Sequence, residues 1–183
     1  MKLLRTIALD PSDTFVFEVP AEPGEWAVSG AFRFCDQDPA QLSRKERAAF
    51  RSGFLGVQSW GWSTLAQIVP ATEDDCQALI ERLARQLVDR FGAPDIVAAR
   101  AAAEEEVAFA QSLCTHPISS LIAVHRSLSG DAVHESFRRL QLREGQRPGH
   151  GHGKAFSFMA VEDDVEPDSD LRIADMGREP RLR

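Results

Sequence analysis

The chain has 183 residues, of which 43% are hydrophobic and 27% charged, a composition typical of a globular protein and not of a disordered or membrane-embedded one. Its 21 Lys and Arg against 28 Asp and Glu give a formal net charge of −7, and no dense basic stripe with interleaved aromatic residues occurs, so a nucleic-acid partner is not expected. The length predicts about one domain, able to fold without a metal or a disulfide.

The cysteines and the amino terminus indicate the compartment. Cys35, Cys76 and Cys114 are an odd number of cysteines without Cys-x-x-Cys spacing, which argues against a secreted disulfide framework and a thiolate zinc site. The first residues lack the continuous apolar segment of a signal peptide, and no stretch has the length of a membrane-spanning helix. We expect a cytoplasmic protein with reduced thiols and no membrane partner.

The first part of the chain predicts strands. Alternating residues over 3–9 predict a strand that stops at the turn cluster 10–13. β-Branched and aromatic residues over 14–19, and a similar pattern over 26–34, predict two more strands. The short turns between these three segments favour an antiparallel meander.

A short helix is then expected to interrupt the sheet. Ser43 and Glu46 have the spacing of a capping box, and helix formers continue to about Arg51. Two apolar, β-prone segments over 54–60 and 63–69 follow, and they predict a second hairpin.

After Pro70 the hydrophobic period becomes helical. Thr72 is suited to cap a first helix and Gly92 to end it, and Pro94 can open a second helix after a short loop. Apolar residues at helical spacing form the buried faces, namely Leu79, Leu83, Leu87 and Phe91 in the first helix and Ile96, Ala99, Ala103, Val107 and Leu113 in the second. The pair is expected to form a helical hairpin.

The last elements complete a predicted α+β fold. Residues 121–128 predict a strand, and the Ser-Gly-Asp sequence after it leads into a C-terminal helix through Leu140. We predict a single α+β domain over 1–140, with a mostly antiparallel sheet of about five to six strands packed against the helical hairpin. Residues 141–183 are expected to form a flexible, acidic tail, in which only 155–161 is apolar enough to dock, for example as an edge strand.

Two tryptophans and a His-Arg pair are the candidate ligand-binding or partner-binding residues. Trp60 and Trp62 lie close together in sequence, where they can line a pocket or a partner surface, or pack the sheet against the helical hairpin. His125 and Arg126 lie on the predicted strand 121–128, and we include them in the same candidate site.

Three further groups could carry chemistry, and each also has a structural explanation. Consecutive glutamates at 104–106 cannot all face one site, so a solvated helix face is expected. Cys114 and His116 follow a helix C-terminus, where a thiolate is disfavoured, and this favours a buried structural cysteine. His150 and His152 could bind a divalent metal weakly, although Gly-His repeats also fill flexible linkers.

Six short segments carry a resemblance to a known family. They are residues 2–7, 10–17, 21–30, 54–56, 90–95 and 123–126. Together they resemble an uncharacterised proteobacterial domain-of-unknown-function family over about residues 1–140. The resemblance transfers no catalytic residues. It implies a place beside genes for oxidoreductases and their accessory proteins, and hence an assembly or accessory role.

Three functional hypotheses follow. The first is a non-catalytic accessory or protein-interaction domain, favoured because no group of acid, base and nucleophile stands out. The second is a small-molecule-binding domain or small enzyme with its site between the sheet and the helical hairpin. The third is weak metal binding through His150 and His152. We predict no resident cofactor, and either a protein partner or a homo-oligomer.

Overall fold

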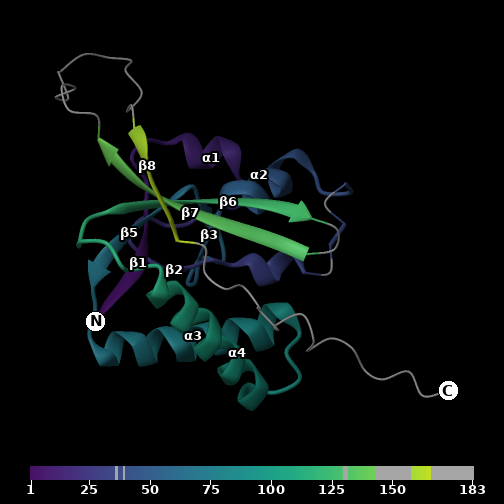
Figure 1. Cartoon of the computed structure of the whole chain (residues 1–183). Coiled ribbons are helices and arrows are strands. Elements are labelled where there is room, and N and C mark those ends of the chain that lie inside the picture. Colours follow the sequence, from purple (N-terminus) through teal and green to yellow (C-terminus); the bar gives the residue numbers. More distant parts are fainter. Residues whose placement is uncertain (36, 39, 130–131, 143–157, 166–183) are drawn as a thin grey trace.

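A computed structural model shows one antiparallel sheet with helices packed against it (Figure 1). The structure describes residues 1–35, 37–38, 40–129, 132–142 and 158–165. The strands are β1 (Lys2–Ile7), β2 (Trp26–Val28), β3 (Phe54–Gly56), β4 (Trp62–Ser63), β5 (Leu65–Pro70), β6 (Leu121–Ser129), β7 (Ala132–Leu142) and β8 (Phe158–Val165). The helices are α1 (Ser12–Val16), the 3₁₀ helix η1 (Ala31–Phe34), α2 (Arg44–Ser52), α3 (Glu73–Phe91) and α4 (Ile96–Ser112).

The strand order is β4-β3-β2-β1-β5-β6-β7-β8, and every pairing between neighbouring strands is antiparallel. Seven strands lie within residues 1–142, and β8 adds an eighth on the outer side of β7. The predicted α+β class and antiparallel sheet are confirmed, but the sheet has more strands than the five to six expected.

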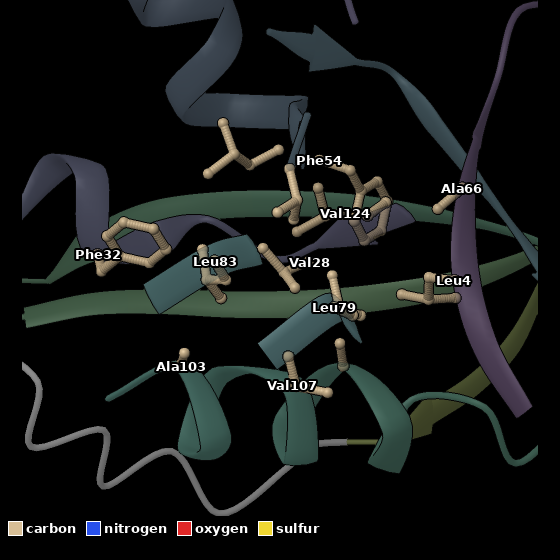
Figure 2. Packing of buried hydrophobic residues seen from close by; sticks show 14 of the residues in the cluster. Leu4, Val28, Phe32, Phe54, Ala66, Leu79, Leu83, Ala103, Val107 and Val124 are labelled. Carbon is tan, nitrogen blue, oxygen red and sulfur yellow. The ribbon is translucent and has the colours of Figure 1, made fainter. Parts of the chain in front are cut away.

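The helical hairpin is confirmed, with both ends of its first helix as predicted. Thr72 caps α3 in a reciprocal capping box with Asp75, and Gly92 ends the helix in the left-handed conformation. α3 and α4 lie side by side beneath the sheet in Figure 1. Figure 2 shows Leu83 of α3 and Val107 of α4 pointing toward the strands, where they join the buried core.

The start and the buried face of α4 differ from the prediction. Asp95 caps the helix by accepting the N–H groups of Val97 and Ala98, so Pro94 precedes the cap and does not open the first turn. Ile96 is 53% exposed, whereas Glu106 is buried. Compared with the predicted face, the buried face of α4 is therefore rotated about the helix axis, toward small residues and the Glu106 carboxyl group.

One of the predicted N-terminal strands is wrong, and another is shorter than expected. Residues 12–16 form α1, where the Asp13 carboxylate accepts hydrogen bonds from the N–H and hydroxyl of Thr64. The expected strand over 26–34 ends at Val28, because Gly30 adopts a φ of +76° and begins η1. A left-handed residue cannot continue an extended strand, and glycine adopts it without steric cost.

The predicted C-terminal helix is also wrong, because residues 132–142 form β7. Its buried side chains alternate at Glu135 and Phe137, the period of a strand. Glu135 stands directly opposite Arg126 in the β6–β7 register and forms an ion pair with it. β8 falls in the segment expected to be tail, and most of residues 141–183 lie outside the described residues.

Candidate functional site

The turn between β3 and β4 places Trp60 in a rare backbone conformation. Trp60 has a φ of +63°, in the left-handed region that costs a residue with a side chain about 1–2 kcal/mol. The loop closes on itself, because the Trp60 N–H donates to Gly56 O at 2.9 Å and the Gly56 N–H donates to Gly61 O at 2.8 Å. Such strain is retained where the surroundings enforce it, and it is frequent at functional sites.

Glu25 enforces this loop conformation from outside. Its carboxylate accepts the N–H of Gln58 at 2.6 Å and the N–H of Ser59 at 2.8 Å. It also accepts the Ser59 hydroxyl, whose oxygen in turn accepts the Gly61 N–H at 3.0 Å. The position of the Trp60 ring therefore follows from a hydrogen-bonded network and not from packing alone.

The Trp60 ring lines a pocket of about 190 Å³, here called the Arg33 pocket. Its walls come from the segment after α1, from η1, from α2, from the β3–β4 turn and from the end of α3. The lining residues are Glu18, Val19, Arg33, Phe34, Gln37, Lys45, Glu46, Ala49, Ser59, Trp60, Trp62 and Arg90. Because drug-sized ligands need about 300 Å³ or more, this pocket has room for one small group.

Arg33 is the distinctive side chain of the pocket. Its guanidinium carbon lies 5.2 Å from the centroid of the Trp60 ring and 5.7 Å from that of Trp62, within the range of a cation–π contact. Its Nη1 atom is buried and has no hydrogen-bond partner among the described residues. Burial and the positive charge of Arg90 both lower the pKa of Arg33. The pocket thus contains a half-buried cation with one enclosed donor that lacks a partner among the described residues.

The charge balance of the pocket is opposite in sign to that of the chain. Arg33, Lys45 and Arg90 face two carboxylates, Glu18 and Glu46, whereas the whole chain carries −7. The Glu46 carboxylate accepts the N–H of the α2 N-cap at 2.8 Å, and this bond lowers its pKa. The pocket therefore carries an excess of one positive charge.

Arg126 supports a wall of the pocket from behind. Its Nη1 donates to Phe50 O at 3.1 Å and to Gly53 O at 2.8 Å, which satisfies carbonyls at the C-terminus of α2. Nη2 donates to the backbone oxygen of Ser29, and Nε lies 2.6 Å from Glu135 Oε1. Arg126 is only 1% exposed, and these contacts tie the C-terminus of α2 to β6.

A second buried carboxyl group lies beside this network. Glu106 accepts the Gly30 N–H at 2.8 Å and is 2% exposed. Burial raises its pKa to about 7, with the nearby Glu135 charge adding to the rise and the Gly30 hydrogen bond opposing it. The prediction of a solvated face at 104–106 is therefore wrong for Glu106, while Glu104 is exposed and pairs with Arg100 at 3.0 Å.

The structure divides the four candidate residues of the sequence. Trp60 and Trp62 both line the Arg33 pocket. Arg126 lies in the buried network, and His125, its neighbour in β6, is exposed. His150 and His152, predicted to bind metal weakly, lie outside the described residues. Within the described part of the chain, no group of three or more His, Cys, Asp or Glu side chains is arranged to hold a metal ion.

Cys114, which the sequence offered as a group that could carry chemistry, lies in a structural environment. Its thiol donates to Ala110 O at 3.5 Å, and burial raises its pKa to about 11. A thiol in that state is a poor nucleophile at neutral pH.

A second hollow, of about 430 Å³, lies between β1, β2 and α3. Two arginines, Arg5 and Arg82, line it, and Arg5 stacks on Trp26 with its guanidinium carbon 3.7 Å from the ring centroid while its Nη1 donates to the Gly24 carbonyl. Arg5 is thus already paired within the chain and Arg82 is exposed to solvent, whereas the Arg33 pocket holds a buried guanidinium nitrogen without a partner among the described residues, which makes it the stronger candidate.

Sequence reasoning missed the three cations of the Arg33 pocket. Arg33, Lys45 and Arg90 come from three separate elements, and none belongs to a recognisable motif. In the sequence, the pair of tryptophans indicated this pocket, because an indole ring combines a large apolar surface with one N–H donor.

The chain belongs to the family of unknown function DUF6505, which matches residues 1–153. The predicted resemblance to an uncharacterised family is thereby confirmed. No curated protein and no solved structure matches the chain. Among the described residues, no helix combines the length and the apolarity needed to cross a bilayer.

Proposed function

We propose that this protein is a non-catalytic binding domain and that the Arg33 pocket receives an anionic group. The observation that carries the proposal is the buried Nη1 of Arg33, which has no acceptor among the described residues. An unsatisfied buried donor costs about 1–3 kcal/mol, and more when it is charged. An oxygen of a carboxylate or phosphate entering the pocket would satisfy it after a shift of the Arg33 side chain, because Nη1 is enclosed in this structure.

Several polar groups of the pocket are already hydrogen-bonded within the chain, and this favours a binding site over a catalytic one. The Ser59 hydroxyl donates to Glu25 and accepts from Gly61, so both of its roles are taken by the loop. Glu46 is held by the N-cap of α2, and Lys45 Nζ donates to Phe17 O at 3.2 Å. Among the other lining residues, the Arg33 cation and the faces of the two indole rings are features of a recognition site.

Tryptophan fluorescence tests the proposal directly. In a Trp26→Phe background, Trp60 and Trp62 are the remaining tryptophans, and both line the pocket. We expect sodium acetate and inorganic phosphate, titrated at constant ionic strength, to change the emission in a saturable way. Arg33→Gln should weaken binding at least 10-fold, about 1.4 kcal/mol.

Arg85→Gln is the matched control, because Arg85 is exposed on α3 and lies outside the pocket lining. It should bind acetate and phosphate as the parent does. Equal responses of the Arg33 and Arg85 variants, or no response to either anion, would contradict the proposal.

The biological role that we attach to this binding is the accessory role predicted from the sequence. The partner would be an oxidoreductase or its maturation protein in the cytoplasm of a proteobacterium. Affinity purification of the tagged wild type, beside the Arg33→Gln variant, from the native cells tests this. Recovery of such a partner in stoichiometric amounts with the wild type only would support the role, and recovery of the tagged protein alone would count against it.

A further inference from the structure

The size of the Arg33 pocket limits how much of a ligand it can enclose. Its 190 Å³ suffices for one carboxylate with its adjoining methylene groups, so the bulk of a larger ligand must rest on the surrounding surface. The chemistry of that rim therefore defines the ligand class.

One side of the rim is apolar and exposed. Val19 lines the pocket and is 49% exposed. The preceding helix α1 buries none of its residues and presents Phe15 and Val16 to solvent. Exposed large apolar side chains that follow one another along the chain up to a pocket residue are a feature of protein-binding surfaces.

A second exposed apolar side chain follows the lining residue Arg90. Phe91 follows Arg90 on α3 and is 39% exposed, with Val88 exposed one turn before it. The Phe91 ring packs edge-on against Phe32 at 5.2 Å, and Phe32 contacts Trp60 at 6.1 Å between centroids. Phe91 is thus continuous with the aromatic wall of the pocket.

These features together select one kind of occupant. A free phosphate would leave both apolar rims in water, and a polyanion such as nucleic acid would be repelled by a chain of net charge −7. One positive charge in excess, two tryptophans, an arginine and nearby exposed apolar side chains match the centre of a protein interface, where Trp and Arg dominate the binding energy.

We propose that the Arg33 pocket takes the side-chain carboxylate of an Asp or Glu in a segment of a partner protein, with apolar residues of that segment covering Val19 on one side and Phe91 on the other. This inference rests on the anion-binding function proposed above. It names the anion as part of a peptide and gives the apolar rims a role in specificity.

Peptide display tests the inference with the whole chain as bait. Random nine-residue peptides are selected on the wild-type protein and, in parallel, on Arg33→Gln. We expect the wild type to enrich peptides that carry one Asp or Glu between apolar residues, and the variant to lose that enrichment. Replacing the acid of a selected peptide with its amide should weaken binding at least 10-fold.

The rim is tested separately with a Val19→Ser/Phe91→Ser variant. Its Kd for the selected peptide should rise at least 10-fold, while its Kd for acetate stays within twofold of wild type. An unchanged melting temperature in each variant shows that the fold is retained, and Arg85→Gln serves as the control in both assays.

The outcomes separate the two proposals. If acetate and phosphate bind through Arg33 but no acidic peptide is enriched, or the rim variant binds the peptide normally, the partner-segment inference is wrong and the anion pocket stands. If neither the anions nor the peptides bind, both proposals are wrong.

Discussion

Arg126 and His125 are neighbours in β6, yet Arg126 is buried with its guanidinium against the end of α2 while His125 is exposed. The alternation of a strand accounts for the difference, since successive side chains point to opposite faces. Both residues were assigned to one candidate site from the sequence, but in the sheet their side chains lie on opposite faces.

Arg126→Met should therefore destabilise the protein strongly. The change leaves the Glu135 charge buried without its partner and removes the donors to the carbonyls of Phe50 and Gly53. We expect a loss of about 3–5 kcal/mol in the free energy of unfolding, measured with urea. His125→Ala is the control and should change it by less than about 0.5 kcal/mol. Equal small effects would show that the ion pair is dispensable.

Glu106 should make stability depend on pH. Its pKa of about 7 exceeds the ordinary 4.5, so between these pH values the folded protein holds a proton that the unfolded chain releases. The contribution of Glu106 to the free energy of unfolding therefore falls as pH rises from about 4.5 to 7, and the loss is complete above 7. Glu106→Gln removes this dependence and keeps an oxygen for the Gly30 N–H.

The measurement is urea unfolding at pH 4.5 and pH 8. A pKa change of one is worth about 1.4 kcal/mol. The free energy of unfolding of Glu106→Gln, relative to that of the wild type, should therefore rise by up to about 3 kcal/mol from pH 4.5 to pH 8. Glu105→Gln, an exposed neighbour, should follow the wild-type curve. Parallel curves for all three proteins would show that Glu106 titrates normally.

Gly30→Ala should be far more damaging than Gly24→Ala. Both glycines have a positive φ, of +76° and +85°, but a Cβ at Gly30 would lie 2.5 Å from Leu55 Cβ and 3.1 Å from the Trp62 ring, whereas a Cβ at Gly24 meets nothing within 4 Å. Gly24→Ala should therefore cost only the strain of about 1–2 kcal/mol. Gly30→Ala should cost more than that and weaken acetate binding, because Trp62 must move.

Thiol labelling should distinguish the three cysteines. Cys35 is exposed, while Cys76 and Cys114 are buried and burial raises the pKa of both thiols. A chromogenic disulfide reagent at pH 8 should modify Cys35 rapidly and the other two only on unfolding. Absence of the fast phase in Cys35→Ser would assign it. A fast phase that persists in this variant would show that a buried thiol is accessible in the folded protein.

The helices with a clear start signal were predictable from the sequence. Ser43 and Glu46 form the expected capping box, Thr72 caps α3 as expected, and Gly92 ends α3 as predicted. These signals work because they depend on contacts between residues three or four positions apart. No residue distant in sequence is needed to predict where these helices begin and end.

The wrong prediction for β7 arose because a residue distant in sequence determines its secondary structure. In β7, Val133 and Phe137 are spaced as on a helix, and the alternation became meaningful only with Glu135 buried against Arg126 of the neighbouring strand. A glutamate in a buried position is hard to predict, since burial of an unpaired charge is costly and the pairing is invisible in a local window.

The candidate site was predictable only in its aromatic part. Trp60 and Trp62 are conspicuous in the sequence, but Arg33 and Arg90 lie 57 positions apart and meet through the packing of η1 beside the end of α3. Their repulsion, which lowers the pKa of Arg33, exists only in the folded chain.

The loop around Trp60 is fixed before any ligand arrives. Glu25 holds it through the N–H groups of Gln58 and Ser59, and the backbone of Trp60 is already in its strained conformation. A group entering the pocket therefore meets a preorganised ring, and association loses little of the free energy that ordering a mobile loop would require. Recognition at such a site depends on shape and charge complementarity, because the loop has little freedom to adapt to a poorly fitting ligand.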